Sequence, residues 1–339
     1  MVQYADHLTV PVHYQAKLDV RETEIAIKLI KDQAEAQIAD TLNLTRVSAP
    51  LFVRPETGLN DNLNGVERPV SFDIKDIGAQ VEVVQSLAKW KRLALASYGF
   101  HPGEGLYTDM NAIRRDEVLD NLHSVYVDQW DWEKIITRRQ RSLEFLQAIV
   151  LDIYRCLCRV ENHVLRHYPQ LERKLPANLY FITSQELEDR YPDYTPRQRE
   201  DEICREKKAV FILQIGGKLK SGLAHDGRAP DYDDWQLNGD LLFWYPVLER
   251  SFEISSMGIR VDEQSMREQL IQAGCPEREV LDFHQRVLQN AVPLSVGGGI
   301  GQSRLCMFFL DKAHIGEVQA SVWPDSMLAD CRQFGINLL

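Results

Sequence analysis

The sequence predicts an α+β protein in which helices flank a mostly antiparallel sheet. Two long stretches, residues 22–42 and 139–167, carry apolar residues at helical spacing. Short runs of strand-forming residues lie between and after them, without the regular strand–helix alternation of a doubly wound parallel sheet. No repeat, low-complexity tract or Pro/Ser/Gly-rich linker divides the chain. We therefore expect one continuous domain.

The first helix follows an N-terminal extension. Periodicity is weak over residues 1–20, whereas residues 22–42 place Ile25, Leu29 and Ile38 at helical spacing. Asn43 ends this helix, and residues 45–53 then predict a strand. Pro50 interrupts that strand, which is typical of a sheet edge or an interface.

The second long helix and most of the strands follow. Residues 139–167 carry a wide apolar stripe that would cover one face of the sheet. Strands are predicted at residues 81–84, 106–113, 123–133, 179–182, 210–215, 241–245 and 252–259. A last helix should follow the glycines of residues 297–301 and carry residues 305–310 into the core.

Composition excludes several classes of protein. With 339 residues, 44% of them apolar, the chain is neither disordered nor fibrous. Its longest apolar stretches, such as residues 209–215, are far short of the roughly 20 residues of a membrane span. The net charge of −11 argues against a basic nucleic-acid-binding surface. Six cysteines without a CxxC pair indicate free thiols, so we expect a soluble cytoplasmic protein.

Polar residues alternate along the segment at residues 107–133. One strand ends at Arg114, a charged loop follows, and a second strand begins near His123. The two-residue period of a strand places Gln129, Asp131 and Glu133 on one face, opposite two tryptophans that would anchor the strand. This pattern predicts a polar pocket, although a solvated sheet face would show the same alternation.

A glycine-rich segment precedes Arg304. Residues 295–305, SVGGGIGQSRL, lack the third glycine of a dinucleotide-binding fingerprint and are not a P-loop. Small residues that approach a helix start, with an arginine one turn later, suit a phosphate group. A tight packing turn is the alternative.

Three weaker patterns do not identify a functional site by themselves. Asp240 and Glu253 fall on paired strands and suit Mg²⁺, or they are ordinary surface carboxylates. Residues 85–92, QSLAKWKR, are by themselves typical of a solvated helix face. His163 and His167 lie four apart on the long helix, but no third metal ligand is evident.

Taken together, these segments resemble a known family. TRVSAPLF, the Arg114 strand–loop–strand and GGGIGQSRL resemble, in order, the three motifs of the class II aminoacyl-tRNA synthetase core, aspartyl and asparaginyl branch. With DNLNGVE, SLAKWKR, GEGLYT, HSVYVDQWDWE, IGGKL, RAPDYDDW, LNGD and SSMGIRVD, the chain is similar to ammonia-dependent asparagine synthetases, the aspartate-ammonia ligases. The resemblance implies that residues 21–339 form a single adenylate-forming catalytic domain with the class II synthetase-like fold.

The resemblance also implies a reaction and an ATP site. Such enzymes use ATP to convert L-aspartate into β-aspartyl-adenylate and pyrophosphate, and ammonia then displaces AMP to give L-asparagine. Adenylate formation requires the negative charge on the α-phosphate to be neutralised, so arginines and Mg²⁺ are the groups expected to do this. The resemblance assigns Arg114 to the α-phosphate and the attacking carboxylate, Arg304 to the far phosphates and His123 to a nucleotide contact. It assigns Mg²⁺ to Asp240 and Glu253.

Aspartate and ammonia are assigned to a further set of residues. By the resemblance Lys91 and Arg260 hold the side-chain carboxylate, Gln129 and Asp131 surround the α-amino group, and Ser86 lies five residues before Lys91 in the family's flipping segment. Asp61 would attract ammonium or accept its proton, with Gln129 nearby. The alternative for Asp61 is ordinary turn chemistry in the loop DNLNG.

Two alternative functions and a homodimer are also considered for this chain. A tRNA ligase fragment and a non-catalytic amino-acid-binding regulator are the alternatives, but only about 40 residues precede the first motif, too few for an anticodon-binding barrel. No glutamine-hydrolysing domain is evident, so we expect free ammonia as the nitrogen donor. The family pattern implies a homodimer through the first helix, although a self-contained core would also bury its stripe. The roles of Arg228, Asp231 and Asp233 stay open.

Overall fold

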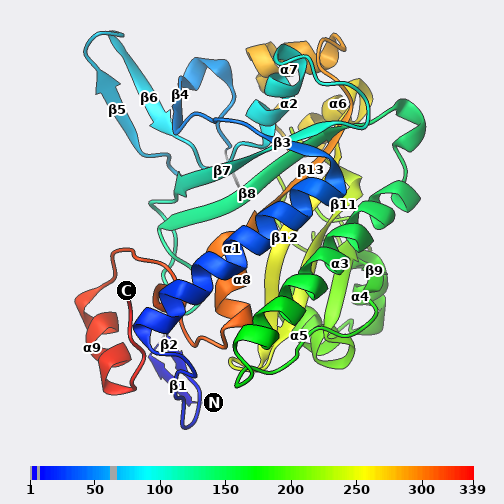
Figure 1. Cartoon of the computed structure of the whole chain (residues 1–339). Helices are drawn as coiled ribbons and strands as arrows, with labels where there is room; N and C mark the ends of the chain where they lie inside the picture. The colour runs from blue at the N-terminus through cyan, green and yellow to red at the C-terminus, as the bar shows by residue number, and fades with distance from the viewer. Residues whose placement is uncertain (1, 6–7, 62–66) are drawn as a thin grey trace.

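An eight-stranded sheet forms the centre of the molecule, which we describe from a computed structural model that covers residues 2–5, 8–61 and 67–339 (Figure 1). The strand order is β3-β7-β8-β13-β12-β11-β10-β9. The inner pairs are all antiparallel, and only the edge strands β3 and β9 run parallel to their neighbours. The strands are β3 (Leu44–Arg46), β7 (Gly105–Ile113), β8 (Tyr126–Ile135), β9 (Tyr180–Thr183), β10 (Ala209–Leu213), β11 (Asp233–Tyr245), β12 (Arg250–Arg260) and β13 (Ser295–Gly301). The predicted α+β class is confirmed.

Two smaller sheets flank this one. Strands β4 (Phe52–Val53), β6 (Ala79–Val83) and β5 (Ser71–Ile74) form a three-stranded sheet that projects from one end, and β1 (Val2–Ala5) pairs with β2 (Leu8–Val10). The prediction of one strand over residues 45–53 was wrong, because β3 and β4 belong to different sheets. Pro50 lies between them and has no N–H to donate to a ladder. Both strands lie at sheet edges, as the proline predicted.

Helix α1 (Val20–Leu42) confirms the first predicted helix. Asp19 and Glu22 form a capping box at its start, and Asn43 ends it in the left-handed conformation at φ 56°. Its buried residues recur at intervals of four, at Ala26, Ile30, Ala34 and Ile38, and join the main core, whereas Ile25 of the predicted stripe is exposed. The chain itself therefore buries only part of the predicted stripe.

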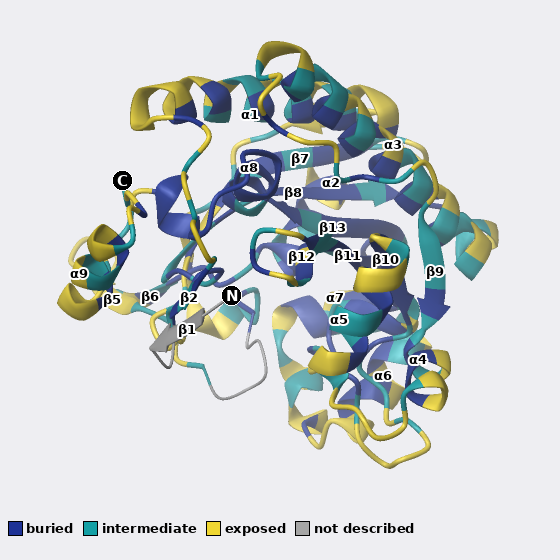
Figure 2. Ribbon diagram, turned by 90° about the horizontal axis from the view of Figure 1, so that it is seen from below, coloured by how far each residue is buried: buried dark blue, intermediate teal, exposed yellow. Residues whose placement is uncertain are grey.

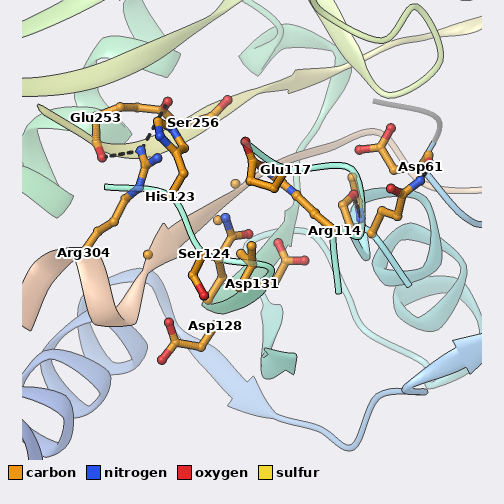
Figure 3. Close-up of a pocket in the computed structure, with 18 of the residues that line it drawn as sticks. Asp61, Arg114, Glu117, His123, Ser124, Asp128, Asp131, Glu253, Ser256 and Arg304 are labelled. Carbon is orange, nitrogen blue, oxygen red and sulfur yellow. Dashed lines mark hydrogen bonds and ion pairs between the residues drawn. The ribbon is translucent and has the colours of Figure 1, made fainter. Parts of the chain in front are cut away.

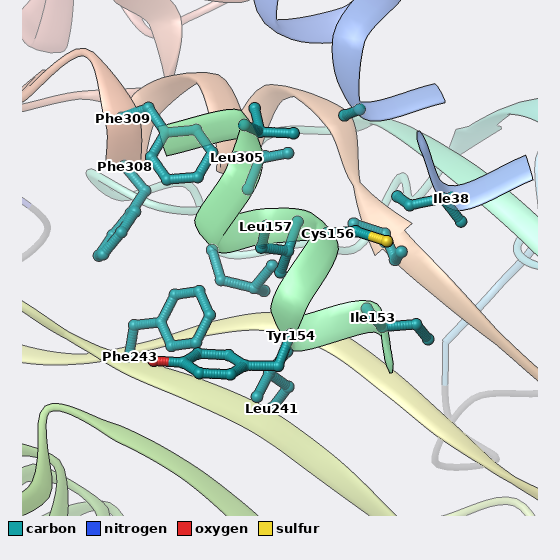
Figure 4. Packing of buried hydrophobic residues seen from close by; sticks show 14 of the residues in the cluster. Ile38, Ile153, Tyr154, Cys156, Leu157, Leu241, Phe243, Leu305, Phe308 and Phe309 are labelled. Carbon is teal, nitrogen blue, oxygen red and sulfur yellow. The ribbon is translucent and has the colours of Figure 1, made fainter. Parts of the chain in front are cut away.

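Helix α3 (Leu143–His167) lies beside α1 on the same face of the sheet (Figures 1 and 2). It begins at Leu143 rather than at residue 139 because Ser142 caps it, accepting a hydrogen bond from Phe145 N. Its apolar stripe, with Ile153 and Leu157, packs against Phe243 and against helix α8 (Gln302–Phe309) (Figure 4). This side of the sheet is a closed hydrophobic core.

Among the described residues, helices cover parts of the opposite face of the sheet. Helix α4 (Ser184–Arg190) packs against β9 and α5 (Pro196–Lys207) packs across β10, β11 and β12, while α2 (Ala88–Ser97) packs against β7, β8 and β13, and α6 (Glu263–Gln272) and α7 (Asp282–Leu288) pack together near the start of β11. The middle, where polar side chains of β8 and β12 emerge, opens into a cavity. The fold therefore places its polar site between two helical layers.

The glycine segment is the largest departure from prediction. Residues 297–301 were expected to approach a helix start either as a phosphate-binding segment or as a tight packing turn, but they belong to β13, an inner strand paired with both β8 and β12. The helix that follows, α8, is confirmed. A further helix, α9 (Asp325–Gln333), was not predicted; it packs through Met327 and Cys331 against Leu8 and Val10. The division of the chain at residue 20 stays a prediction.

Two remaining predictions concern cysteines and membranes. All six cysteines are free, as predicted. Across the part of the chain that the structure describes, none of the helices combines the length and the apolar composition needed to cross a membrane.

Candidate active site

A cavity of about 570 Å³ opens over the middle of the sheet. It gathers most of the residues that the sequence singled out: Asp61, Ser86, Arg114, His123, Gln129, Asp131, Glu253, Arg260 and Arg304 line it. The other two lie just behind its wall, where Lys91 forms an ion pair with Asp131 and Asp240 forms one with Arg228. Residues that are more than 200 positions apart in the chain therefore share one pocket.

Glycines on β13 create the room for these side chains. An added Cβ at Gly297 would lie 1.9 Å from Glu133 Oε2, and one at Gly299 would lie 2.4 Å from Gln129 Oε1. Both glycines lie on the cavity side of the sheet, because they pair with Glu133 and Asp131 across the β13–β8 ladder, and Gly299 lines the cavity. The glycines therefore leave space for neighbouring side chains and a ligand, and they do not form a phosphate-binding loop.

The cations of α2 are buried, so the interpretation of residues 85–92 as a solvated helix face was wrong. Lys89, Lys91 and Arg92 are 2%, 0% and 3% exposed. Lys91 Nζ bonds to Asp131 and donates to Trp132 O at 2.9 Å and to Gly298 O at 3.2 Å. Burial lowers the pKa of Lys91, although Asp131 opposes this shift. All three of its donors are used behind the pocket wall.

Arg260 is held beneath the cavity by two carboxylates. Its Nε lies 3.0 Å from each oxygen of Glu133, its Nη2 lies 2.7 Å from Glu133 Oε2, and its Nη1 bonds to Asp233. Burial disfavours its charge, but Glu133 and Asp233 outweigh that effect and raise the pKa of Arg260. Burial in turn raises the pKa of Asp233. Arg260 lines the cavity, and its guanidinium has five N–H groups, more than these two carboxylates accept.

Arg304 and Glu253 meet at one end of the pocket, with Asp61 at the other (Figure 3). Arg304 Nη1 donates to Glu253 O at 3.0 Å and lies 3.6 Å from Glu253 Oε2. The pKa of Glu253 is raised, first because the protein displaces water from it and then because the Asp240 carboxylate repels its charge. Arg228 bonds to Asp240 at 2.6 Å and also to Ser256. Cations and carboxylates alternate at this end.

Arg114 and His123 lie on either side of the loop between β7 and β8. Arg114 N donates to Val125 O at 2.8 Å, and its guanidinium lies 4.0 Å from Glu117. The strand was predicted to begin near His123 but begins at Tyr126, because Asp120 accepts from the backbone of residues 122 and 123 and holds them in a turn. Asp120 also bonds to His123 Nδ1 at 2.8 Å. Arg114 Nε is buried without a hydrogen-bond partner among the described residues, so it is available to a ligand.

Asp61 and Ser86 come from neighbouring loops. Asn60 Oδ1 accepts from Asp61 N at 3.0 Å and from Gln85 N at 2.8 Å, and Gln85 Nε2 donates to Asp61 O at 3.0 Å. These bonds fix Asp61 with only 3% of its surface exposed. The rest of the DNLNG loop, residues 62–65, lies outside the described residues.

The segment at residues 226–233 supplies residues to which the sequence assigned no role. Arg228, Tyr232 and Asp233 line the cavity. Asp231 instead turns away and accepts bonds from Lys89 at 3.2 Å and His284 at 3.1 Å. The charged residues of RAPDYDDW were visible in the sequence, but which of them face the pocket depends on the path of this segment.

The carboxylates Asp240 and Glu253 fit the magnesium assignment in residue type. Leu242, on the same face of β11 as Asp240, pairs with Glu253 across the β11–β12 ladder, so both carboxylates emerge on the cavity side. Mg²⁺ uses one or two carboxylates together with substrate phosphates. Within the described ranges no cluster of three or more His, Cys, Asp or Glu side chains is placed to hold a metal by itself. His163 and His167 lie with their rings 4.6 Å apart, and His167 Nδ1 lies 3.0 Å from His163 O in its own helix.

A family model described as aspartate-ammonia ligase matches residues 21–335. The chain belongs to the aspartate-ammonia ligase family. It is 63% identical over 330 residues to the aspartate–ammonia ligase of Ruminiclostridium cellulolyticum, covering 97% of this chain and 98% of that protein. It is 58% identical to the aspartate–ammonia ligase of Clostridium tetani over 339 residues, with coverage of 100% and 99%. The predicted family and enzyme class are confirmed.

Solved structures of synthetases share the fold. Asparaginyl-tRNA synthetase of Pyrococcus horikoshii, complexed with asparaginyl-adenylate, matches with a TM-score of 0.65 and 16% identity over 89% of this chain and 70% of that one. Asparaginyl-tRNA synthetase of Entamoeba histolytica, in complex with asparaginyl-adenylate, matches with a TM-score of 0.63 and 13% identity over 88% of this chain and 66% of that one. The class II synthetase-like fold is confirmed. The whole-length ligase relatives do not favour a tRNA ligase fragment or a non-catalytic regulator.

Proposed function

We propose that this protein amidates L-aspartate with ammonia in two steps. ATP and the aspartate side chain first give β-aspartyl-adenylate and pyrophosphate, and ammonia then displaces AMP to give L-asparagine. The observation that carries the proposal is the placement of Arg114 and Arg304 around one cavity with Gln129, Asp131 and Arg260. Two separated cations suit a polyphosphate, and the mixed charges suit an amino acid.

Arg114 and Arg304 divide the work on ATP. The guanidinium of Arg114, whose Nε has no partner among the described residues, would donate to the α-phosphate and to the attacking carboxylate, which brings the two anions together at low electrostatic cost. Arg304 would hold the far phosphates, and His123 would contact the nucleotide. Asp240 and Glu253 would hold Mg²⁺, which would supply positive charge for the phosphates of ATP.

Aspartate would bind by replacing an ion pair that the residues of the pocket wall now make with one another. Its α-ammonium suits Asp131 and Gln129, while its side-chain carboxylate suits the remaining N–H groups of Arg260. Lys91 now bonds to Asp131. When the substrate ammonium takes over Asp131, Lys91 Nζ would turn to the substrate carboxylate, with Ser86 beside it.

Ammonia requires a site that favours ammonium and then removes a proton. Asp61 lines the cavity and would attract ammonium and accept its proton, with Gln129 as a neighbour. The variant Asp61→Asn tests this role, because pyrophosphate exchange measures only the first step. We expect exchange to persist while asparagine formation falls about a hundredfold. Equal losses in both assays would contradict a specific role in ammonia use.

The overall reaction has a direct test. The protein is incubated with ATP, Mg²⁺ and L-aspartate, with and without ammonia or tRNA, and the products are identified. We expect ammonia-dependent formation of AMP, pyrophosphate and asparagine, and no effect of tRNA. Aspartyl-tRNA as the product, or AMP release that ignores ammonia, would contradict the proposal.

We also propose a cytoplasmic homodimer that contacts its partner through α1 and β4. Ile25 on α1 is 57% exposed, and Leu51 and Phe52 are 52% and 40% exposed. Such apolar surface is suited to an interface. Sedimentation at low concentration would contradict the dimer if it gave only monomer.

A further inference from the structure

Helix α8, which carries Arg304 into the active site, lacks a cap of its own. Its N-cap residue is Gly301, which has no side chain to accept from the first turn. A Cβ at Gly301 would lie 3.1 Å from the Cβ of Arg304, closer than side chains normally pack. A serine or aspartate at this position would therefore crowd the arginine.

Asp128 on β8 supplies the missing cap from another part of the chain. Its Oδ1 accepts from Ser303 N at 3.1 Å, and its Oδ2 accepts from Ser303 Oγ at 2.8 Å. Asp128 is 7% exposed and lies on the strand that also carries Gln129 and Asp131. One buried carboxylate thus ties the start of α8 to the strand beneath the aspartate pocket.

Two further side chains hold this carboxylate in place. Lys31 of α1 lies 3.0 Å from Asp128 Oδ2 and compensates its charge. Gln319 Nε2 donates to Asp128 Oδ1 at 3.3 Å and to Ser303 Oγ at 3.1 Å. The Asp128 carboxylate therefore has fixed partners on α1, α8 and the C-terminal segment.

We propose that Asp128 is a positioning residue for Arg304. Ser303 directly precedes Arg304. A fixed Ser303 therefore sets the direction in which the Arg304 guanidinium extends to Glu253 O, 3.0 Å away. In Figure 3 Asp128 lies below Arg304, outside the line from Arg304 to Glu253. The inference rests on the proposed role of Arg304 in binding the phosphates of ATP. Asp128 also lines the cavity, but Ser303, Gln319 and Lys31 occupy both of its carboxylate oxygens, so in this proposal it acts through the helix start.

The first test is steady-state kinetics of Asp128→Asn. An amide can accept from Ser303 N but cannot also accept from Ser303 Oγ and Lys31, so the first turn of α8 loosens. We expect the KM for ATP to rise about tenfold, as misplacing a binding group does, while the KM for aspartate stays within about twofold. The matched control is Asp109→Asn, which removes a carboxylate that contacts α8 through the side chain of Gln302, at 3.2 Å, and otherwise pairs with Arg46, at 3.1 Å. Equal KM values for ATP in Asp128→Asn and wild type would overturn the inference.

A double-mutant cycle separates positioning from general damage. Arg304→Ala should raise the KM for ATP by itself, and Asp128→Asn should add nothing in that background. Additive effects would overturn the positioning role and leave the role of Arg304 intact. A normal KM for ATP in Arg304→Ala would instead overturn the role of Arg304, and with it the positioning inference.

A less disruptive variant keeps the proposal testable if Asp128→Asn does not fold. Ser303→Ala keeps the backbone bond to Asp128 and the pair with Lys31 but removes the two Oγ bonds, to Asp128 and from Gln319. We expect a rise of about threefold in the KM for ATP, because the backbone bond still holds the helix start. An unchanged KM in Ser303→Ala, together with an unfolded Asp128→Asn, would mean that the network serves stability alone and would overturn the proposal.

Discussion

Arg260 and Glu133 form a two-pronged ion pair beneath the cavity, with Arg260 Nε 3.0 Å from both carboxylate oxygens and Nη2 2.7 Å from Oε2. Neither side chain is more than 3% exposed. Ser295 Oγ donates to the same carboxylate at 2.6 Å, and Lys91 lies 3.7 Å from it. Glu133 therefore orients the residue proposed to hold the substrate carboxylate.

Removing the charge of Glu133 should damage both stability and aspartate binding. Glu133→Gln leaves Arg260 and Lys91 buried with less compensation, and we expect a loss of about 3–5 kcal/mol in the free energy of unfolding. Urea unfolding measures the loss, and the KM for aspartate should rise. The control Glu202→Gln removes a surface partner of Arg205 and should change stability by less than about 1 kcal/mol. A Glu133→Gln protein as stable as wild type would contradict the expectation.

The glycine at position 299 should be required for binding more than for folding. Alanine there would place a Cβ 2.4 Å from Gln129 Oε1, the movable end of a side chain, so the protein should fold with Gln129 displaced. We expect the KM for aspartate to rise about tenfold. Gly217→Ala is the control, because nothing lies within 4 Å of its added Cβ. Equal kinetics for the two variants would show that Gln129 can move without cost.

The ionised side chain of Glu253 should lower the free energy of unfolding at neutral pH. Because its pKa is raised above the ordinary value, the folded protein binds its proton more tightly than the unfolded chain does. Its contribution to stability therefore falls as the pH rises from about 4.3, the unfolded pKa, through the folded pKa. Because the Glu253 side chain is 46% exposed and water screens its charge, the effect should be small. Glu253→Gln should melt at a slightly higher temperature than wild type at pH 8, melt like wild type below pH 4, and lose adenylation activity.

Thermal unfolding at pH 4 and pH 8 checks this sign. Glu249→Gln, an exposed glutamate in the turn of the same hairpin, serves as the control and should match wild type at both values. A Glu253→Gln protein that melts below wild type at pH 8 would mean that the carboxylate stabilises the fold.

Asp231 should anchor the segment that carries Arg228 and Tyr232. Burial opposes its ionisation, but Lys89 and His284 outweigh that effect and hold the pKa of Asp231 well below its usual range. The stability that it contributes is therefore present above about pH 3.9, the unfolded pKa, and lost as the pH falls below it. Asp231→Asn should cost about 3 kcal/mol at pH 7 and less at pH 3.

Urea unfolding at the two pH values tests the anchor. Asp282→Asn on α7, which removes an exposed pair with Arg286, should cost no more than about 0.5 kcal/mol. If Asp231→Asn lost no more stability than this control, the buried cluster would not hold the segment in place.

Much of the fold was predictable because its elements carry local signals. The apolar spacing of α1 and α3 acts over a few residues, so the sequence determined where these helices end, while the capping residues Asp19 and Ser142 set starts that the spacing alone missed by two and four residues. The two-residue alternation of β8 likewise determined that Gln129 and Asp131 share a face. Motifs in the right order determined the family.

Only the tertiary structure decided which charges are buried and what they touch. Lys91 and Arg92 look like surface residues by local pattern, and the packing of α2 against the sheet buries them. The glycines of β13 resembled a turn, because a sequence does not show that Glu133 and Gln129 from another strand fill the space beside them. Asp128 caps a helix 175 residues further along the chain. Contacts between distant segments set these outcomes, since burial, charge pairing and steric room depend on neighbours that local sequence does not specify.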